Sequence, residues 1–154
     1  MGEINLIKIT GGMFKVLFLC TENACRSQMA EGLVNHDLAG QVQAFSAGVR
    51  PTRVNPVAIQ VMAELGIDIS HQRSKSVDEL AGEHFDLVIT LCDQAQEQCP
   101  LFPGDTEVIH VSFPDPAKGS GSERIFRKVR DALRERLIPL LREKLRQRQP
   151  ERSS

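Results

Sequence analysis

Residues 15–27 read KVLFLCTENACRS, and this stretch decides the class of fold. Its first six residues, Lys15 to Cys20, are a short and almost continuously apolar run, which is typical of a strand buried on both faces of a sheet. A polar loop follows, and the apolar pattern of a helix begins near Ser27. A buried strand joined to a helix by so short a loop predicts an α/β domain with a parallel sheet.

Strands and helices continue to alternate on the C-terminal side of this stretch. Further strands are predicted at Val42 to Ala47, Phe85 to Leu91 and Glu107 to Val111. One helix is predicted to begin at Asn55 and Pro56 and to stop at Gly66, and a short one is predicted at Val77 to Ala81 after a Ser76 cap. A long terminal helix is predicted because apolar residues recur at every fourth position from Ile125 to Leu141, with a bend at Pro139.

The chain has 154 residues, the length of one ordinary domain. We predict a single three-layer α/β domain over residues 14–146, in which a four-stranded parallel sheet is flanked by helices. Residues 1–13 are interpreted as an N-terminal extension, and residues 147–154 as a disordered tail.

The charge balance indicates no polyanionic partner. The chain carries 19 basic and 20 acidic side chains, a net charge of −1. Residues 122–154 hold 11 basic and 5 acidic side chains, but they lack aromatic interleaving for bases to stack on, so we interpret them as a solvated helix face. No apolar run approaches the ~18 residues of a membrane span, and no signal-peptide pattern opens the chain. We therefore expect a cytoplasmic monomer without a nucleic-acid or membrane partner.

The cysteines Cys20, Cys25, Cys92 and Cys99 are spaced unlike a structural zinc site. In a cytosolic protein such cysteines favour catalysis over structural disulfides. The four histidines show no ligand spacing either, and we interpret His110, near a strand end, as a structural residue. We therefore predict no bound metal.

Cys20 ends the first predicted strand, at the sheet edge where α/β proteins bind ligands. The N–H groups of the following helix attract a tetrahedral oxyanion, and the same field favours the nucleophilic thiolate. Arg26 adds a planar fork that can hold two oxygens, and the Ser27 hydroxyl can donate to the sulfur. The alternative is a buried strand-end cysteine and a surface arginine. The Cys-x5-Arg-Ser spacing between strand and helix instead favours an oxyanion site formed by Thr21, Glu22, Asn23, Ala24, Cys25, Arg26 and Ser27.

The stretch VLFLCTENACRSQMAEG, residues 16–32, resembles the N-terminal signature of the low-molecular-weight tyrosine phosphatase superfamily, and more closely its arsenate reductase branch. Phe113-Pro114-Asp115-Pro116 resembles the late Asp-Pro loop of that superfamily, although the tyrosine that typically follows in phosphatases is missing. Thr90-Leu91-Cys92-x6-Cys99-Pro100 resembles the redox cysteines of thioredoxin-coupled arsenate reductases. The resemblance covers residues 14–140, nearly the whole predicted domain.

The resemblance implies reduction of arsenate to arsenite, for arsenic detoxification, by a relay of three cysteines. Cys20 would attack arsenic, with Arg26 holding the anion and Asp115 protonating the departing oxygen. Cys92 would then attack the Cys20 sulfur and release arsenite, and Cys99 would attack Cys92 and carry the disulfide outward. The resemblance further implies thioredoxin as electron donor, no bound cofactor, and phosphate or sulfate as competing oxyanions.

The spacing of the later cysteines agrees with such a relay. Cys92 is expected at the carboxyl end of the third strand, on the same sheet edge as Cys20. Cys99 lies seven residues beyond Cys92, about two helical turns, so these two could bond only if the segment unwinds. Residues 93–98 are polar and contribute little core, which is typical of a segment of low stability. Cys25, inside the loop, is interpreted as a packing residue.

Several residues depart from the usual pattern of this family. Glu22 stands where the branch commonly has glycine, and its carboxylate could weaken anion binding unless it turns to solvent. Asn23 is expected to hold the tight turn of the loop, since asparagine tolerates the left-handed conformation. Glu31 and Ser46 match a structural cation site of some relatives, but Lys75 stands where a further carboxylate would complete it, and its ammonium could replace the cation.

Two other functions remain open. A low-molecular-weight protein tyrosine phosphatase would use Cys20, Arg26 and Asp115, with the two later cysteines serving only as redox protection. The missing tyrosine speaks against it. A thiol sensor or an oxyanion-binding adaptor would result if Glu22 abolishes turnover. A sensor would oxidise with peroxide but would form no arsenate-dependent disulfide.

Overall fold

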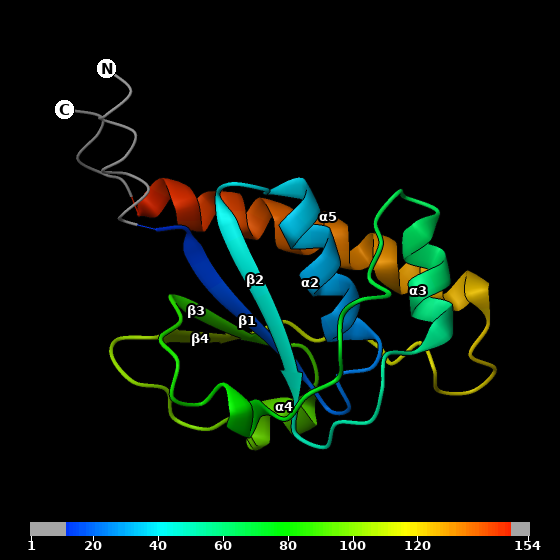
Figure 1. The fold of residues 1–154 in the computed structure, drawn as a ribbon, viewed down its shortest axis with the longest axis horizontal. Coiled ribbons are helices and arrows are strands. Elements are labelled where there is room, and N and C mark those ends of the chain that lie inside the picture. Colours follow the sequence, from blue (N-terminus) through cyan, green and yellow to red (C-terminus); the bar gives the residue numbers. More distant parts are fainter. Residues whose placement is uncertain (1–11, 149–154) are drawn as a thin grey trace.

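A parallel sheet of four strands, in the order β2-β1-β3-β4, forms the centre of the molecule (Figure 1). The strands are β1 (Phe14–Cys20), β2 (Val42–Gly48), β3 (Leu87–Thr90) and β4 (Glu107–His110). This computed structural model describes residues 12–148, so the predicted N-terminal extension, apart from Gly12 and Met13, lies outside the described residues. The sheet and its flanking helices confirm the predicted α/β class.

β1 lies between β2 and β3 because its sequence suits burial on both faces of the sheet. Residues 16–19 have no exposed surface. The register of β1 against β2 sets Cys20 opposite Gly48, and the register against β3 sets Leu19 opposite Thr90. The carboxyl ends of these three strands therefore meet at one edge of the sheet, which carries the loop that follows Cys20.

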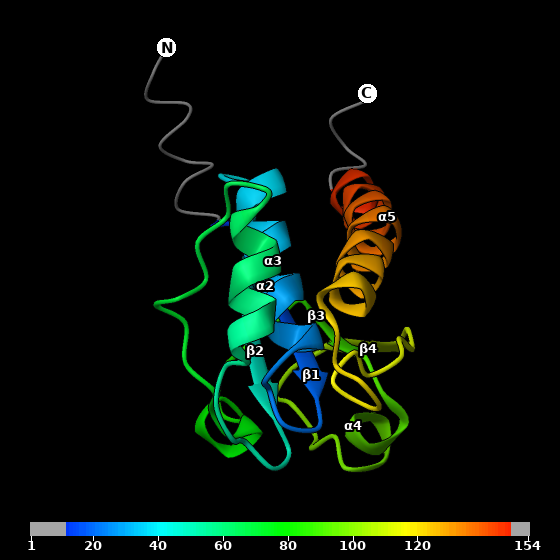
Figure 2. The same ribbon diagram turned by 90° about the vertical axis from the view of Figure 1, so that its right-hand side faces the viewer.

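In the part of the chain that the structure describes, five helical segments accompany the sheet. They are α2 (Arg26–Asp37), α3 (Pro56–Ala63), a 3-10 turn (Val77–Glu79), α4 (Asp93–Glu97) and α5 (Glu123–Gln147). α2 packs on β1, β2 and α5, and α3 packs on α2 and α5. Figures 1 and 2 show α4 at the end of the molecule toward which the strands point. Within residues 12–148 no helix has both the length and the apolar character needed to cross a membrane.

Three helical segments are shorter than the sequence predicts. The helix predicted at Val77 to Ala81 is a 3-10 turn that ends at Glu79. α3 ends at Ala63 rather than running to Gly66, which has a φ of +77° and forms the turn beyond the helix. α4 ends at Glu97, so it makes little more than one turn where two were expected. Cys99 therefore lies beyond the end of α4 rather than on its second turn.

The terminal helix is longer than predicted. α5 continues through Pro139, whose ring lies on the exposed side, and ends at Gln147. The N–H of Arg148 still donates to the carbonyl of Lys144 (3.1 Å). The prediction of a tail beginning at residue 147 is therefore wrong by two residues, because the intrahelical bonds persist to Arg148. The predicted disorder of residues 149–154 lies outside the described residues.

Candidate active site

A pocket at the carboxyl edge of the sheet brings together most of the predicted site residues. Its volume is about 880 Å³, and Cys20, Arg26, Cys92 and Asp115 all line it. Cys20 ends β1, Cys92 immediately precedes α4, and Asp115 lies in the loop after β4. Three segments distant in sequence meet here because parallel strands end at the same edge. Cys99 does not belong to the lining.

Asn23 holds the loop between Cys20 and α2 in shape. It is buried, and its φ of +53° makes it the only non-glycine residue of the described chain in the left-handed region. Its Nδ2 donates to Ser27 Oγ (2.7 Å) and Ser46 Oγ (3.0 Å), and its Oδ1 accepts from the backbone N–H of Lys75 (2.9 Å). The predicted role of Asn23 in the tight turn is confirmed.

The sulfur of Cys20 has a hydroxyl partner. Cys20 is 2% exposed, and its Sγ lies 2.9 Å from Ser27 Oγ. Because Asn23 donates to the same oxygen, the hydroxyl hydrogen of Ser27 is free to point at the sulfur. A donor in that position stabilises the charge of a thiolate, which is the nucleophilic form of cysteine.

The guanidinium of Arg26 is buried with one donor unused. Its Nη1 donates to the carbonyl of Phe113 (3.0 Å), and its Nη2 lies 4.0 Å from Asp115 Oδ2. Its Nε is the only buried side-chain nitrogen or oxygen in residues 12–148 without a hydrogen-bond partner. A buried donor left unpaired costs about 1–3 kcal/mol. A tetrahedral oxyanion in the pocket would supply the missing acceptor.

Asp115 begins a turn and also lines the pocket. Its Oδ1 accepts from the N–H of Ala117 (3.0 Å), which forms the turn that follows. Its Oδ2 faces Arg26, and its side chain is 39% exposed, so the carboxyl can exchange protons with solvent. A carboxyl that lines the same pocket as the thiol can serve as a general acid.

The two later cysteines differ in their surroundings. Cys92 is buried and its Sγ lies 3.2 Å from Thr21 Oγ1, in the loop after β1. Cys99 is half-buried, and its thiol donates only to the neighbouring carbonyl of Pro100 (3.5 Å). Burial raises the pKa of Cys99 above the ordinary thiol value. All four cysteines are free thiols in this structure.

Cys25 lies in the loop but is not available for chemistry. It is 5% exposed, and burial, with a contribution from the nearby Asp115 carboxylate, raises the pKa of its thiol to about 12. A thiol of this kind stays protonated near neutral pH and is a poor nucleophile. These surroundings are those of a packing residue.

Comparison with known proteins identifies the family of this chain. The sequence pattern of the low molecular weight phosphotyrosine protein phosphatase family matches residues 15–151. The chain belongs to this family. It is 44% identical over 126 residues to an arsenate reductase of Halalkalibacterium halodurans, which covers 79% of this chain and 91% of that relative.

Solved structures of this phosphatase family agree with the sequence comparison. An arsenate reductase in the phosphate binding state is 36% identical, with a TM-score of 0.70, over 85% of this chain and 98% of that one. The YwlE arginine phosphatase from Geobacillus stearothermophilus is 28% identical, with a TM-score of 0.72, over 90% of this chain and 96% of that one. The similar proteins thus include some named arsenate reductases and one named a phosphatase.

Glu22, the unusual residue of this phosphatase-family loop, stands at the rim of the pocket. Its side chain is exposed, and its Oε1 accepts from Thr52 Oγ1 (3.4 Å). Its backbone carbonyl accepts from the N–H of Thr52 (3.1 Å) and from Ser74 Oγ (2.9 Å). The neighbouring segments therefore fix the backbone of Glu22, while its carboxylate is in contact with solvent, which screens its charge.

The residues that match the structural cation site form a polar group in which Ser46 is buried and Glu31 and Lys75 are half-buried. Ser46 Oγ donates to Glu31 Oε1 (2.6 Å), and burial raises the pKa of Glu31. The ammonium of Lys75 donates to the carbonyl of Arg73 (3.1 Å), and burial lowers its pKa. The charge of Lys75 lowers the pKa of Glu31, and the charge of Glu31 raises the pKa of Lys75, so each charge favours the other.

Several lining residues were not predicted from the sequence as parts of the site. Arg50, Gln94 and Lys118 stand in the pocket wall, and Arg50 Nη2 donates to Gln94 Oε1 (3.0 Å). A search for charged residues just beyond each strand end could have found Arg50, which follows β2 by two residues. Gln94 and Lys118 carry no such signal, because their place depends on how α4 and the Asp115 loop fold back.

Proposed function

We propose that this chain reduces arsenate to arsenite. One observation carries the proposal: a single pocket holds the Cys20 thiol, the unpartnered Nε of Arg26 and a second thiol, Cys92. Cleavage of a phosphate ester needs one thiol and an oxyanion site, but a two-electron reduction needs a second sulfur within reach. The relatives named arsenate reductases support the same choice.

The first chemical step joins sulfur to arsenic. Arsenate binds to the loop N–H groups and to Arg26, and the Cys20 thiolate attacks the arsenic. An As–O bond breaks as the S–As bond forms, and Asp115 gives its proton to the departing oxygen, which leaves as water. Arsenic remains in the pentavalent state at this stage.

Reduction takes place in the second step. The Cys92 thiolate attacks the Cys20 sulfur, forming the Cys20–Cys92 disulfide and breaking the S–As bond. The electron pair of that bond stays on arsenic, which becomes trivalent and leaves as arsenite after taking up a proton. Two thiols have supplied the two electrons, and the oxidation is now held in one disulfide.

The third step moves the disulfide to the surface. The Cys99 thiolate attacks Cys92, a Cys92–Cys99 disulfide forms, and Cys20 leaves as the thiolate. A thioredoxin-type dithiol then reduces this disulfide and is itself oxidised. Because burial raises the pKa of Cys99, this thiol is a weak nucleophile until its segment opens. The proposal includes a cytoplasmic monomer as the working form, since a reducing compartment keeps the resting thiols reduced.

A coupled assay tests the proposal. The protein is supplied with arsenate, thioredoxin, thioredoxin reductase and NADPH, and NADPH loss is followed for the parent and for Cys92→Ser and Cys99→Ser. We expect arsenate-dependent oxidation that falls to background in both variants. Oxidation that survives either substitution would contradict the three-cysteine relay. A protein that oxidises with peroxide but forms no arsenate-dependent disulfide would instead be a thiol sensor.

Phosphatase activity is the second candidate, and the family of the chain favours it. Cys20, Arg26 and Asp115 form the set that phosphate-ester hydrolysis requires. No tyrosine or tryptophan is present in the chain to line a pocket for an aromatic ester, and Phe113 is buried. Hydrolysis of p-nitrophenyl phosphate that is lost in Cys20→Ser and retained in Cys92→Ser, without arsenate-dependent NADPH oxidation, would establish the phosphatase and overturn the reductase.

A further inference from the structure

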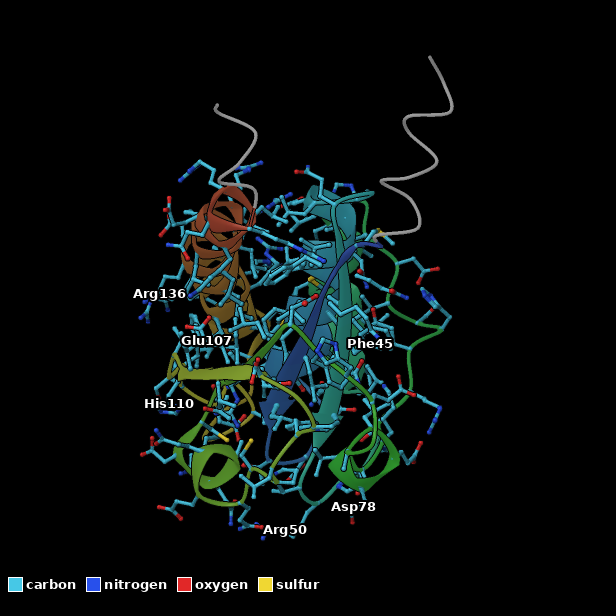
Figure 3. The ribbon with its side chains drawn as sticks, turned by 90° about the vertical axis from the view of Figure 1, so that its left-hand side faces the viewer. Phe45, Arg50, Asp78, Glu107, His110 and Arg136 are labelled. Atoms are coloured by element: carbon cyan, nitrogen blue, oxygen red, sulfur yellow. The ribbon has the colours of Figure 1, made fainter. Side chains whose placement is uncertain are left out.

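Within residues 12–148, the side-chain hydrogen bonds of α4 and of its N-cap residue Cys92 all lie at the start of the helix. Thr21 Oγ1 lies 3.2 Å from Cys92 Sγ. His110 Nε2 lies 3.2 Å from Asp93 Oδ1, and Arg50 Nη2 donates to Gln94 Oε1 (3.0 Å). The partners come from three different elements: the loop after β1, the end of β4 and the segment after β2. Figure 3 shows Arg50 and His110 at the end of the molecule where α4 lies.

His110 and Arg50 are themselves held in place by hydrogen bonds. The Nδ1 of His110 lies 2.8 Å from the hydroxyl of Thr90, at the end of β3. The backbone N–H of Arg50 donates to the carbonyl of Thr21 (2.8 Å), in the loop that binds the oxyanion. Hydrogen bonds therefore connect the first turn of α4 to the ends of β3 and β4 through His110, and to the oxyanion loop (residues 21–25, after β1) through Arg50.

The second half of α4 has no comparable attachment. Residues 96–98 are exposed, and within the described chain none of their side chains makes a hydrogen bond. Ala95 is buried and is the last residue of the helix to contact the core. Cys99 follows with a thiol that donates only to its neighbour, Pro100. Side-chain hydrogen bonds thus hold α4 at the end next to Cys92, and none within the described chain holds it at the end next to Cys99.

The two disulfides of the proposed relay require different conformations of α4. The Cys20–Cys92 disulfide needs Cys92 held against the oxyanion loop. The Cys92–Cys99 disulfide needs Cα atoms about 4.4–6.8 Å apart, whereas the helix Asp93–Glu97 between the two cysteines by itself rises about 7.5 Å. The segment must unwind to form it, and the contacts made by Asp93 and Gln94 are then lost.

We propose that Arg50 and His110 are positioning residues that hold α4 in the form that favours the Cys20–Cys92 disulfide and opposes the Cys92–Cys99 disulfide. This inference rests on the proposed function. Neither residue touches the reacting sulfurs, so both act through α4. Because the anchors are at the first turn, unwinding begins at Cys99, and Cys99 travels to Cys92 while Cys92 stays at the pocket.

Two disulfide equilibria measured without arsenate test the proposal. One background is Cys25→Ala/Cys99→Ser, which can form only Cys20–Cys92; the other is Cys20→Ser/Cys25→Ala, which can form only Cys92–Cys99. Each is equilibrated with reduced and oxidised glutathione, where one glutathione disulfide takes up the electrons of two protein thiols and yields two glutathiones. Arg50→Ala, His110→Ala and Gln94→Ala are compared in both backgrounds.

We expect each of these substitutions to raise the equilibrium constant for Cys92–Cys99 and to lower that for Cys20–Cys92, so that the ratio of the two constants changes about fivefold, the effect of one hydrogen bond. Gln96→Ala, on the same helix but without a contact, should leave both constants unchanged. His110→Gln, which can still donate to Asp93, should restore the parent values. A general loss of stability would not produce shifts of opposite sign.

The outcomes separate this inference from the function on which it rests. Parent backgrounds that form both disulfides, with variants that shift neither constant or shift both in one direction, would overturn the positioning role and leave the relay intact. Parent backgrounds that form neither disulfide would overturn the relay itself, and the inference with it.

Discussion

The three nitrogens of the Arg26 guanidinium have different surroundings. Nη1 binds the Phe113 carbonyl, Nη2 faces Asp115, and Nε is buried without a partner at the pocket wall. The first contact fixes the orientation of the planar group, so the unused donor is held ready for an anion. A lysine ammonium is a point charge without this fixed fork.

Substitution of Arg26 by lysine should therefore weaken oxyanion binding while keeping the charge. We expect Arg26→Lys to raise the dissociation constant of inorganic phosphate by about tenfold or more, because hydrogen bonds to charged groups contribute about 1.5–3 kcal/mol. Isothermal titration calorimetry measures the effect. Arg124→Lys, on the exposed surface of α5, is the matched control. Equal phosphate affinity in both variants would exclude Arg26 as the anion donor.

Asn23 combines a strained backbone with a set of buried hydrogen bonds. Its φ of +53° is a conformation that alanine adopts only at a cost of about 1–2 kcal/mol, whereas glycine adopts it freely. Asn23→Ala and Asn23→Gly both lose the bonds to Ser27 and Ser46. We expect Asn23→Ala to have a free energy of unfolding about 1 kcal/mol lower than Asn23→Gly, measured by urea denaturation. Equal values would mean that the loop leaves the left-handed conformation once the side chain is gone.

At the scale of elements, β2 shapes the oxyanion loop by direct contact. A Cβ on Gly48 would lie 2.8–2.9 Å from backbone atoms of residues 21–23. The pairing of Gly48 with Cys20 and the bond from the Gly48 N–H to the Lys75 carbonyl (2.9 Å) hold the strand in place. Neither backbone can yield without breaking these bonds, so the position requires glycine for space.

Gly48→Ala should accordingly disturb both stability and the site. We expect the free energy of unfolding to fall by about 1–3 kcal/mol, since overpacking costs this much, and phosphate binding to weaken because the loop is displaced. Gly82→Ala is the control, because a Cβ there meets nothing within 4 Å. Urea unfolding and calorimetry of both variants check this. A Gly48→Ala protein with the phosphate affinity of the parent would contradict the close approach.

At the scale of the whole molecule, several ion pairs join the N-terminal half to the terminal helix, and the pair of Asp37 with Arg134 is one of them. Asp37, at the end of α2, accepts two hydrogen bonds from Arg134 of α5, at 2.7 and 2.8 Å. These bonds, with a smaller contribution from His36, hold the pKa of Asp37 below its ordinary value of 3.8. The carboxylate is therefore favoured more in the folded chain than in the unfolded chain.

The sign of this shift predicts how stability depends on pH. A carboxyl whose pKa is depressed by folding contributes stability that is present above 3.8 and is lost as the pH falls through its lower folded value. Asp37→Asn should lower the free energy of unfolding by about 1 kcal/mol at pH 7. The difference from the parent should shrink as the pH falls below 3.8. Urea denaturation across this range measures it, with the exposed Glu135→Gln as control; a constant difference down to the lowest pH would contradict the ion-pair account.

Much of the fold and the centre of the site could be predicted because their signals are local. The strand from Lys15 to Cys20, the loop and the start of α2 lie in one continuous segment, and its apolar pattern and Cys-x5-Arg-Ser spacing are visible without any partner. The length of α4 could not be predicted. Residues 93–98 have no apolar pattern that a second turn could bury, and the helix stops at Glu97.

By itself the sequence determined the α/β class, the parallel sheet, the loop with its thiol and guanidinium, and the left-handed turn at Asn23. Only the tertiary structure decided which contacts complete the site. Arg26 and the Phe113 carbonyl lie 87 residues apart in sequence, Arg50 and Gln94 lie 44 apart, and His110 and Asp93 lie 17 apart. Such pairs depend on the register of the strands and on where each loop turns back. A local pattern cannot encode them, because each partner looks like an ordinary surface residue until the sheet edge brings the two together.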